Sequence, residues 1–314
     1  MINRQNGMSR LAGPLVPLAA LMGFAHDADA EVKVAASIAP VHSLVAMVTE
    51  GITEPALIVR PGASPHTYAM KPSEAQALDQ ADVVIWIGEA LEPWMTKAIV
   101  TLAGDASVVE LGAVDGVTRL AMREGGDWTA HDHEDHGDDH QDRMAIDPHL
   151  WLDPDNAGIW LSSIAAALAL ADPENAEMYR ANASLAVERL DAMTADIELR
   201  LAPVKKQPYI VFHDAYHYFE RRFGLQPMGS VSLGDADRPG PQRILAIREK
   251  IAKSGAVCAF AEPQFEPKLL DTVIEGHGMK KGELDPIGAG LQPGPDLYPK
   301  LMQNLATSLL ECLG

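Results

Sequence analysis

The fold of this 314-residue chain is constrained most by an alternation of strand-like and helix-like segments that occurs twice. In the first half, β-rich runs such as Val32–Ile38 and Asp82–Ile87 alternate with helical patterns such as Pro93–Leu102. In the second half, helical patterns again separate β-rich runs, among them Tyr209–Phe212 and Val257–Ala261. Strands separated by helices of this length form βαβ units with parallel pairing. The predicted fold class is therefore α/β, with two lobes that each contain a parallel sheet.

A long helical stretch without breaks lies between the two halves. Asp172 is a suitable N-cap, Pro173 suits the first helical position, and Pro203 stops the helix after Ala202. A helix of roughly 30 residues is about 45 Å long. We therefore predict lobes over residues 31–171 and 204–314, joined by one linking helix over residues 172–203. Because a rod of this kind resists wide hinge motion, we expect a fairly rigid binding cleft between the lobes.

The first 30 residues have the features of a secretory signal peptide. Arg4 and Arg10 give a basic start, Leu11–Ala25 is apolar, and Ala28 and Ala30 form a small-x-small cleavage site. An uncleaved membrane anchor is the alternative, but the apolar run is short for a spanning helix and contains two prolines. We expect cleavage after Ala30 and export of the mature chain. The remaining residues, roughly 284, suffice for two domains of typical size.

Net charge and cysteine content narrow the class of protein further. The formal net charge of −19 argues against nucleic acid as a partner, because phosphates require clustered Lys and Arg. Cys258 and Cys312 are the two cysteines, and in an oxidising compartment an even pair indicates a disulfide. A redox-active pair is the alternative, although such pairs are more often spaced C-x-x-C. We predict a structural disulfide, worth about 4 kcal/mol for a closed loop of about 55 residues.

Residues 123–144, called the His-rich loop below, depart from the alternation. The centre of the loop, residues 131–140, reads HDHEDHGDDH, with four histidines and five acids in ten residues. Such a segment cannot bury a core, so we expect it to be solvated and disordered. One hypothesis is a linker that only carries charge. The other is a weak secondary zinc site formed by His131, His133, His136 and His140, with low affinity because ordering the loop costs entropy.

Three other histidines lie where predicted strands give way to loops, which is where open α/β sheets bind ligands. His66 follows the second strand in PGASPHTY, His149 lies in DPHLWLDP, and His213 ends a strand in VFHDAY. Each alone is more typical of a structural residue. Together with one oxygen ligand they form the tetrahedral set that Zn²⁺ prefers. Asp285 in ELDPIG is one candidate for that oxygen, and water is the other.

The same residues carry a family resemblance over nearly the whole mature chain. The motifs PGASPHTYAMKPSEA, ADVVIWIGEALEPW, DPHLWLDP, VFHDAYHYFE, CAFAEPQF and ELDPIG occur in this order. They closely resemble the cluster A-I metal-binding proteins of ABC importers and, within them, the ZnuA-type zinc proteins. The resemblance implies two Rossmann-like lobes, a backbone helix between them, and metal ligands at His66, His149 and His213. Cys258 and Cys312 also resemble the positions of a disulfide found in part of this family.

The resemblance implies that the chain is a periplasmic solute-binding protein, which captures Zn²⁺ and delivers it to an ABC importer. The partners expected are the membrane permease, with its cytoplasmic ATPase, and a periplasmic zinc chaperone, and the protein is expected to be a monomer and not an enzyme. Zinc is favoured over manganese because the manganese relatives have Glu where this chain has His213, and imidazoles suit Zn²⁺. Some zinc relatives have Glu before the first ligand, where this chain has Pro65, so Asp285 or water must supply the fourth ligand.

Several alternatives remain at this point. A secreted zinc hydrolase also has three protein ligands, but the chain has no H-E-x-x-H motif and no evident general base. A manganese-binding paralogue and a metal-dependent adhesin are the other two. Among further candidate residues, His217 is not expected to be a ligand. Glu262 is expected to support the site or the lobe packing. His42 and His277 are expected at the surface or at helix caps.

Overall fold

The first of two parallel sheets is formed by the N-terminal half of the chain. The computed structural model describes residues 1–2, 31–123, 146–232 and 240–314, so nearly all of the predicted signal peptide and of the His-rich loop lies outside the described residues. The strand order is β2-β1-β3-β4, and every pair is parallel. The strands are β1 (Val34–Ala36), β2 (Ala56–Leu57), β3 (Val83–Trp86) and β4 (Ser107–Glu110).

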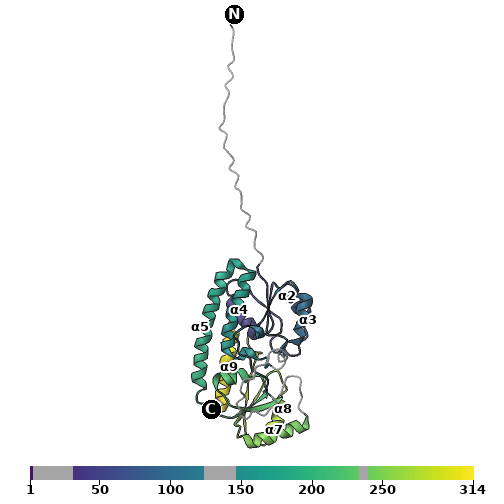
Figure 1. The fold of residues 1–314 in the computed structure, drawn as a ribbon, viewed down its shortest axis with the longest axis vertical. Coiled ribbons are helices and arrows are strands. Elements are labelled where there is room, and N and C mark those ends of the chain that lie inside the picture. Colours follow the sequence, from purple (N-terminus) through teal and green to yellow (C-terminus); the bar gives the residue numbers. More distant parts are fainter. Residues whose placement is uncertain (3–30, 124–145, 233–239) are drawn as a thin grey trace. The chain divides into compact units, whose positions relative to one another are not determined.

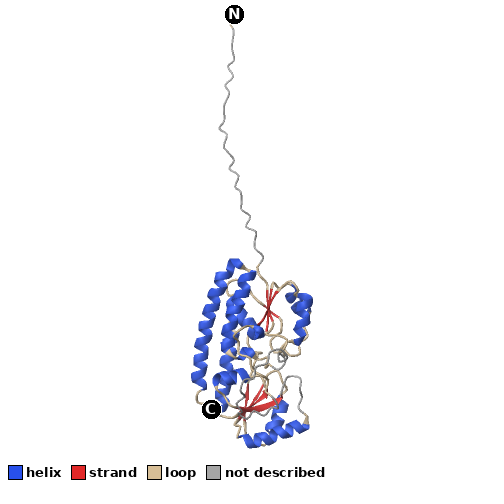
Figure 2. Cartoon of the chain, viewed as in Figure 1, coloured by secondary structure: helices blue, strands red, loops and turns tan. Residues whose placement is uncertain are grey.

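The second sheet repeats this topology in the C-terminal half. Its strand order is β6-β5-β7-β8, again with parallel pairs only. The strands are β5 (Tyr209–His213), β6 (Pro227–Ser232), β7 (Cys258–Ala261) and β8 (Lys280–Glu283). The prediction of an α/β fold with two parallel sheets is confirmed, and Figure 2 shows the strands of each sheet among the helices.

Helices connect the strands and cover both sheets. Those that follow strands of the first sheet are α1 (Ala39–Val48), α2 (Pro72–Asp79), α3 (Pro93–Leu102) and α4 (Pro154–Ala171). In the second half lie α6 (His217–Phe223), α7 (Pro241–Ser254), α8 (Pro267–Ile274) and α9 (Leu297–Leu313). Five of these eight begin with proline. Proline suits the first helical position because its fixed φ is helical and its missing N–H would have no partner there.

The long helix α5 (Ala176–Leu201) joins the two halves, as predicted, but it begins later than predicted. Residues Pro173–Asn175 form a separate 3₁₀ turn, and α5 itself has 26 residues. Asp172 caps this turn: its carboxylate accepts hydrogen bonds from the Asn175 backbone at 3.4 Å and from the Tyr179 hydroxyl at 2.8 Å. The predicted cap is therefore present, but it closes a tighter turn before the α-helix starts.

Alternate strand residues enter different hydrophobic cores, as expected for strands covered on both faces. Ala35 of β1 packs with the side of the first sheet that α2 and α3 cover, whereas Val34 and Ala36 point to the other side. That other side belongs to a larger cluster, which we call the shared core because both sheets contribute to it. Its members include Val34, Ala36 and Ile85 of the first sheet, Val211 and Phe260 of the second, and Leu44, Trp160, Leu190 and Leu305 of helices α1, α4, α5 and α9.

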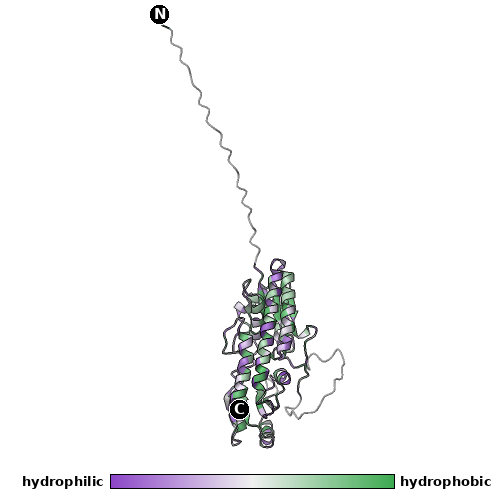
Figure 3. Ribbon diagram, turned by 90° about the vertical axis from the view of Figure 1, so that its left-hand side faces the viewer, coloured by the Kyte–Doolittle hydropathy of each residue, from purple (hydrophilic) through white to green (hydrophobic). Residues whose placement is uncertain are grey.

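Helix α5 is amphipathic rather than apolar throughout. Tyr179 and Leu190 are buried in the shared core, whereas Leu185 and Leu199 are exposed. In Figure 3, the long helices that face the viewer show both hydrophilic and hydrophobic colours. Within the described ranges, no helix combines the length and the apolar character needed to cross a membrane.

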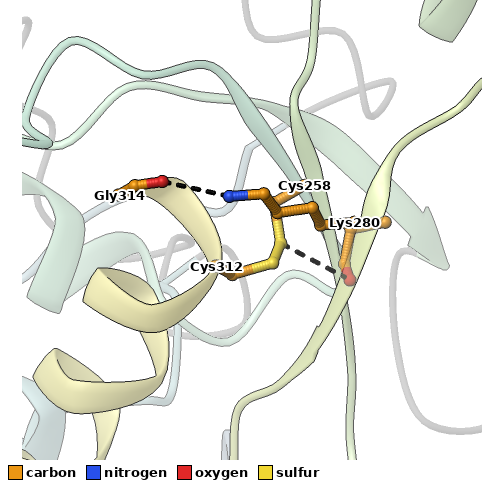
Figure 4. Close-up of a disulfide and its surroundings, with 5 residues drawn as sticks. Cys258, Lys280, Cys312 and Gly314 are labelled. Carbon is orange, nitrogen blue, oxygen red and sulfur yellow. Dashed lines mark hydrogen bonds between the residues drawn. A yellow bond between two sulfur atoms is a disulfide. The ribbon is translucent and has the colours of Figure 1, made fainter.

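A disulfide links the second sheet to the C-terminal helix. Cys258 of β7 and Cys312 of α9 are bridged, with their Cα atoms 6.0 Å apart (Figure 4). Nearby, Lys280 Nζ donates a hydrogen bond of 3.0 Å to the Gly314 carbonyl. The predicted disulfide is confirmed, and it fixes the end of the chain to the second sheet.

One minor prediction was wrong. His42 was expected at the surface or at a helix cap, but it lies within α1 and is only 8% exposed. Every residue of α1 is buried, so this helix has no solvent-facing side. The imidazole is accommodated because Nε2 lies 2.9 Å from the Pro55 carbonyl oxygen.

Candidate metal site

Two loops and the end of a strand bring His66, His149 and His213 to one pocket. His66 lies in the loop after β2, His149 directly precedes the 3₁₀ turn Leu150–Leu152, and His213 is the last residue of β5. All three line the same pocket. In each sheet, parallel strands present the residues at their carboxyl ends along one edge, so His66 follows a strand of the first sheet and His213 ends a strand of the second.

The three imidazoles are close enough to share one ion. The ring centroids of His149 and His213 are 5.0 Å apart, and that of His66 lies 5.3 Å from His149 and 6.1 Å from His213. One potential ligand atom from each histidine lies within 4.8 Å of the others. Nitrogens about 2.0–2.1 Å from one tetrahedral Zn²⁺ are about 3.4 Å apart, so small side-chain movements are sufficient to bind the ion. His149 and His213 are almost fully buried, and His66 is half-buried.

Asp147 orients His149. Its Oδ1 lies 2.8 Å from His149 Nδ1 and also accepts the His149 backbone N–H at 3.0 Å. Burial alone would raise the pKa of Asp147, but the hydrogen bonds from His149 and its charge interaction with this imidazole hold that pKa well below its usual range. An ionised Asp147 accepts a hydrogen bond from the Nδ1–H group of His149, which leaves the lone pair on His149 Nε2. That atom is buried and has no hydrogen-bond partner among the described residues.

Glu262 has the same relation to His213. Its two carboxylate oxygens lie 3.2 Å and 3.1 Å from His213 Nδ1, and both side chains are buried. A carboxylate at Nδ1 fixes the tautomer with Nε2 as the metal-binding nitrogen and makes the imidazole a better ligand. Glu262 therefore supports the site, as predicted from the sequence.

The loop of His66 is anchored to helix α3 by an aromatic side chain. Trp94 Nε1 donates a hydrogen bond of 2.7 Å to the carbonyl oxygen of Pro65, the residue before the histidine. The His66 backbone N–H donates to Ser64 Oγ at 3.3 Å. The position of this imidazole is therefore set by its own loop and by the start of α3, which contains Trp94.

Asp285 is not one of the residues that the structure brings together as potential ligands. Its Oδ1 accepts hydrogen bonds from the backbone N–H groups of Ile287 and Gly288, and its Oδ2 accepts from Ala289. Both oxygens of this carboxylate thus accept hydrogen bonds from the backbone of the loop after β8. Among the described residues, His217 is likewise not part of the group of potential ligands; its Nδ1 lies 3.7 Å from Asp147 Oδ2.

Sequence reasoning missed two polar residues near the histidines. Asp147 begins the DPHLWLDP motif, and its place two residues before His149 is the spacing at which an Asp side chain reaches a nearby backbone N–H. Gln264 lines the pocket and donates from Nε2 to Asp285 Oδ1 at 3.0 Å. Its proximity depends on how β7 and β8 lie side by side, so no local pattern reveals it.

Comparisons with known proteins agree on one family. The family described as "ZnuA: Zinc-uptake complex component A periplasmic" matches residues 34–312. The "High-affinity zinc uptake system protein ZnuA" of Brucella abortus (strain 2308) is 43% identical over 304 residues, covering 89% of this chain and 91% of the relative. The protein of the same name from Paracoccus denitrificans (strain Pd 1222) is 38% identical over 324 residues, covering 96% and 98%.

A solved structure described as "Crystal structure of ZnuA" has the same fold. Its TM-score is 0.75 at 23% sequence identity, and the match covers 91% of this chain and 100% of the other. At this identity the likeness concerns the fold alone. It agrees with the two parallel sheets and the long helix between them.

Proposed function

Since the chain belongs to the ZnuA family of periplasmic zinc-uptake components, we propose that it captures one Zn²⁺ with His66, His149 and His213. The ion is its cargo, delivered to the membrane permease of an ABC importer that works with a cytoplasmic ATPase. The family consists of transport components, so the prediction that the chain is not an enzyme is confirmed. The resemblance seen in the sequence is confirmed as well.

The observation that carries this proposal is the pair of buried carboxylates behind two of the histidines. Asp147 and Glu262 each face an Nδ1 atom, so His149 and His213 both present Nε2 as the ligand nitrogen. Neutral imidazoles favour Zn²⁺ over Mn²⁺, which prefers carboxylate and water oxygens. A site made of three imidazoles therefore supports zinc as the cargo.

The location and domain arrangement follow from the same proposal. Residues 1–30 are proposed to be a signal peptide that directs the mature chain to the periplasm. Residues 31–171 and 204–314 are proposed to be two lobes, with the zinc pocket in the cleft between them. In favour of such a cleft, the pocket is lined both by His66, which follows a strand of the first sheet, and by His213, from the second.

Metal analysis tests the proposed cargo directly. Mature protein purified from periplasm without chelator is expected to contain about one equivalent of zinc and little manganese, because the site has three nitrogen ligands. The measurement is inductively coupled plasma mass spectrometry after gel filtration. A metal-free preparation that takes up manganese as tightly as zinc would contradict the proposal and favour the manganese-binding relatives.

The His-rich loop is proposed to be a weak secondary zinc site. The described residues that flank it lie close to the histidine site: Arg123, at its start, forms an ion pair with Asp214, and Ile146, after its end, pairs with Ala121. Asp214 directly follows His213 in the chain. Zinc held by the loop would therefore be released close to the tighter site.

Deleting residues 131–140 is expected to leave one tight zinc equivalent and to remove additional, weaker equivalents. Imidazoles with a pKa near 6.5 bind metal at pH 7 but are mostly protonated near pH 5.5, so the weaker equivalents should also disappear at the lower pH. Isothermal titration of zinc into parent and variant measures both classes. A control variant that changes His131, His133, His136 and His140 to Asn keeps the length of the loop. If parent, deletion and control take up the same zinc, the loop is only a linker.

A further inference from the structure

The strongest unassigned feature of the pocket is the amide of Gln264. This side chain lines the pocket together with the three histidines. Its Nε2 donates to Asp285 Oδ1, whereas its Oε1 is buried and has no hydrogen-bond partner among the described residues. A buried amide oxygen without a partner is costly, because the group loses its hydration and gains nothing in return. In a binding pocket, such an oxygen is available for a ligand.

The orientation of this amide follows from the chemistry of its neighbour. Asp285 already accepts the backbone N–H groups of Ile287, Gly288 and Ala289, which is the arrangement of an ionised carboxylate. A carboxylate can only accept hydrogen bonds, so Gln264 must turn its NH₂ group toward Asp285. The carbonyl oxygen of the amide then has to face away from Asp285. Asp285 thus fixes an acceptor in the pocket wall instead of contacting the ion itself.

We infer that Gln264 is a positioning residue whose Oε1 accepts a hydrogen bond from a water molecule in the fourth coordination position of the bound Zn²⁺. This inference rests on the proposed function. Zinc sites in proteins use Cys, His and carboxylate ligands, so a neutral amide is better suited to hold a zinc-bound water than to replace it. A metal-bound water is a strong hydrogen-bond donor, and an amide oxygen accepts from it without taking its proton.

A substitution that removes the acceptor but retains the size of the side chain tests this role. Gln264→Met is expected to weaken zinc binding about tenfold, because one hydrogen bond of typical strength is lost. The measurement is competition with a chromophoric zinc chelator. Gln303→Met is the matched control: it makes the same chemical change at an exposed position of α9 and should leave the affinity unchanged.

A second measurement separates positioning of the water from a general structural role. With Co²⁺ in place of zinc, azide replaces the bound water and changes the visible spectrum. Gln264 favours a hydrogen-donating water over an anion that can only accept, so azide should bind the Co²⁺ form of Gln264→Met more tightly than the Co²⁺ parent. Asp285→Asn, which frees the amide to turn, should weaken zinc binding by a similar factor, and the double variant should be no weaker than either single variant.

The possible results distinguish a failure of this inference from a failure of the proposed function. If the parent binds no zinc, or if the three histidines are dispensable, the proposed function fails. If the parent binds zinc through the histidines but Gln264→Met has the parent's zinc and azide affinities, only the role of Gln264 is overturned. The thermal midpoints of the metal-free variants show that each is folded, and Asp285→Asn provides an independent result should Gln264→Met not fold.

Discussion

Replacing His149 with alanine is expected to weaken zinc binding by at least roughly 100-fold, because changing residues behind a ligand already costs 10- to 100-fold. His149 is nearly buried, and its Nε2 has no hydrogen-bond partner among the described residues. The variant loses one of three imidazoles and also leaves the Asp147 carboxylate without its strongest partner. Competition with a high-affinity chelator measures the change.

Two comparisons make this test specific. His277→Ala removes a histidine that lies after α8 and outside the pocket, so zinc affinity should stay at the parent's value. Removing His66, His149 and His213 together should abolish tight binding altogether. A triple variant that binds one zinc as tightly as the parent would show that the ion is held elsewhere.

Removing the disulfide is expected to lower the free energy of unfolding by about 4 kcal/mol, because the cross-link restricts the unfolded chain. Cys258 and Cys312 are separated by 54 positions, and both are buried. The double variant Cys258→Ala, Cys312→Ala also leaves a small cavity between β7 and α9, which adds to the loss. Denaturant unfolding of the two proteins measures the difference.

Reduction provides the control for this prediction. A reducing agent should lower the stability of the parent and leave the double variant unchanged, because the variant has no bond to reduce. Equal stability of parent and variant, or two free thiols in the unfolded and unreduced parent, would contradict the disulfide. The three histidines are elsewhere in the chain, so the folded variant should still bind one zinc.

Much of the fold could be predicted from sequence, because the strands are short apolar runs and most helices begin at proline. The helix starting at Pro93 has the predicted bounds. Strand ends were less accurate: the run predicted over residues 32–38 pairs only at Val34–Ala36. Pairing depends on where a neighbouring strand ends, and hydrophobicity alone does not contain this information. β1 pairs with β2 over two residues and with β3 over three.

For the site, the three histidines and Glu262 could be predicted from sequence, but not the places of Asp147, Gln264 and Asp285. Their motifs are local, and each histidine stands beside a strand end or a proline. The place of Asp285 depends on how the chain turns after β8, where backbone N–H groups surround its carboxylate. Gln264 becomes relevant only once β7 and β8 are adjacent. Contacts between distant segments could not be inferred from spacing.

The shared core has a consequence for how the protein unfolds. Both sheets bury side chains in it, so neither can come apart without exposing apolar surface of the other. Unfolding should therefore be cooperative, with residues 32–314 melting in a single transition rather than half by half. Zinc bound at the proposed site, which is lined by residues from both halves, would then stabilise the entire unit, by an amount that grows with the free ion concentration relative to Kd. A low concentration of free zinc would thus lower the melting temperature of this whole unit.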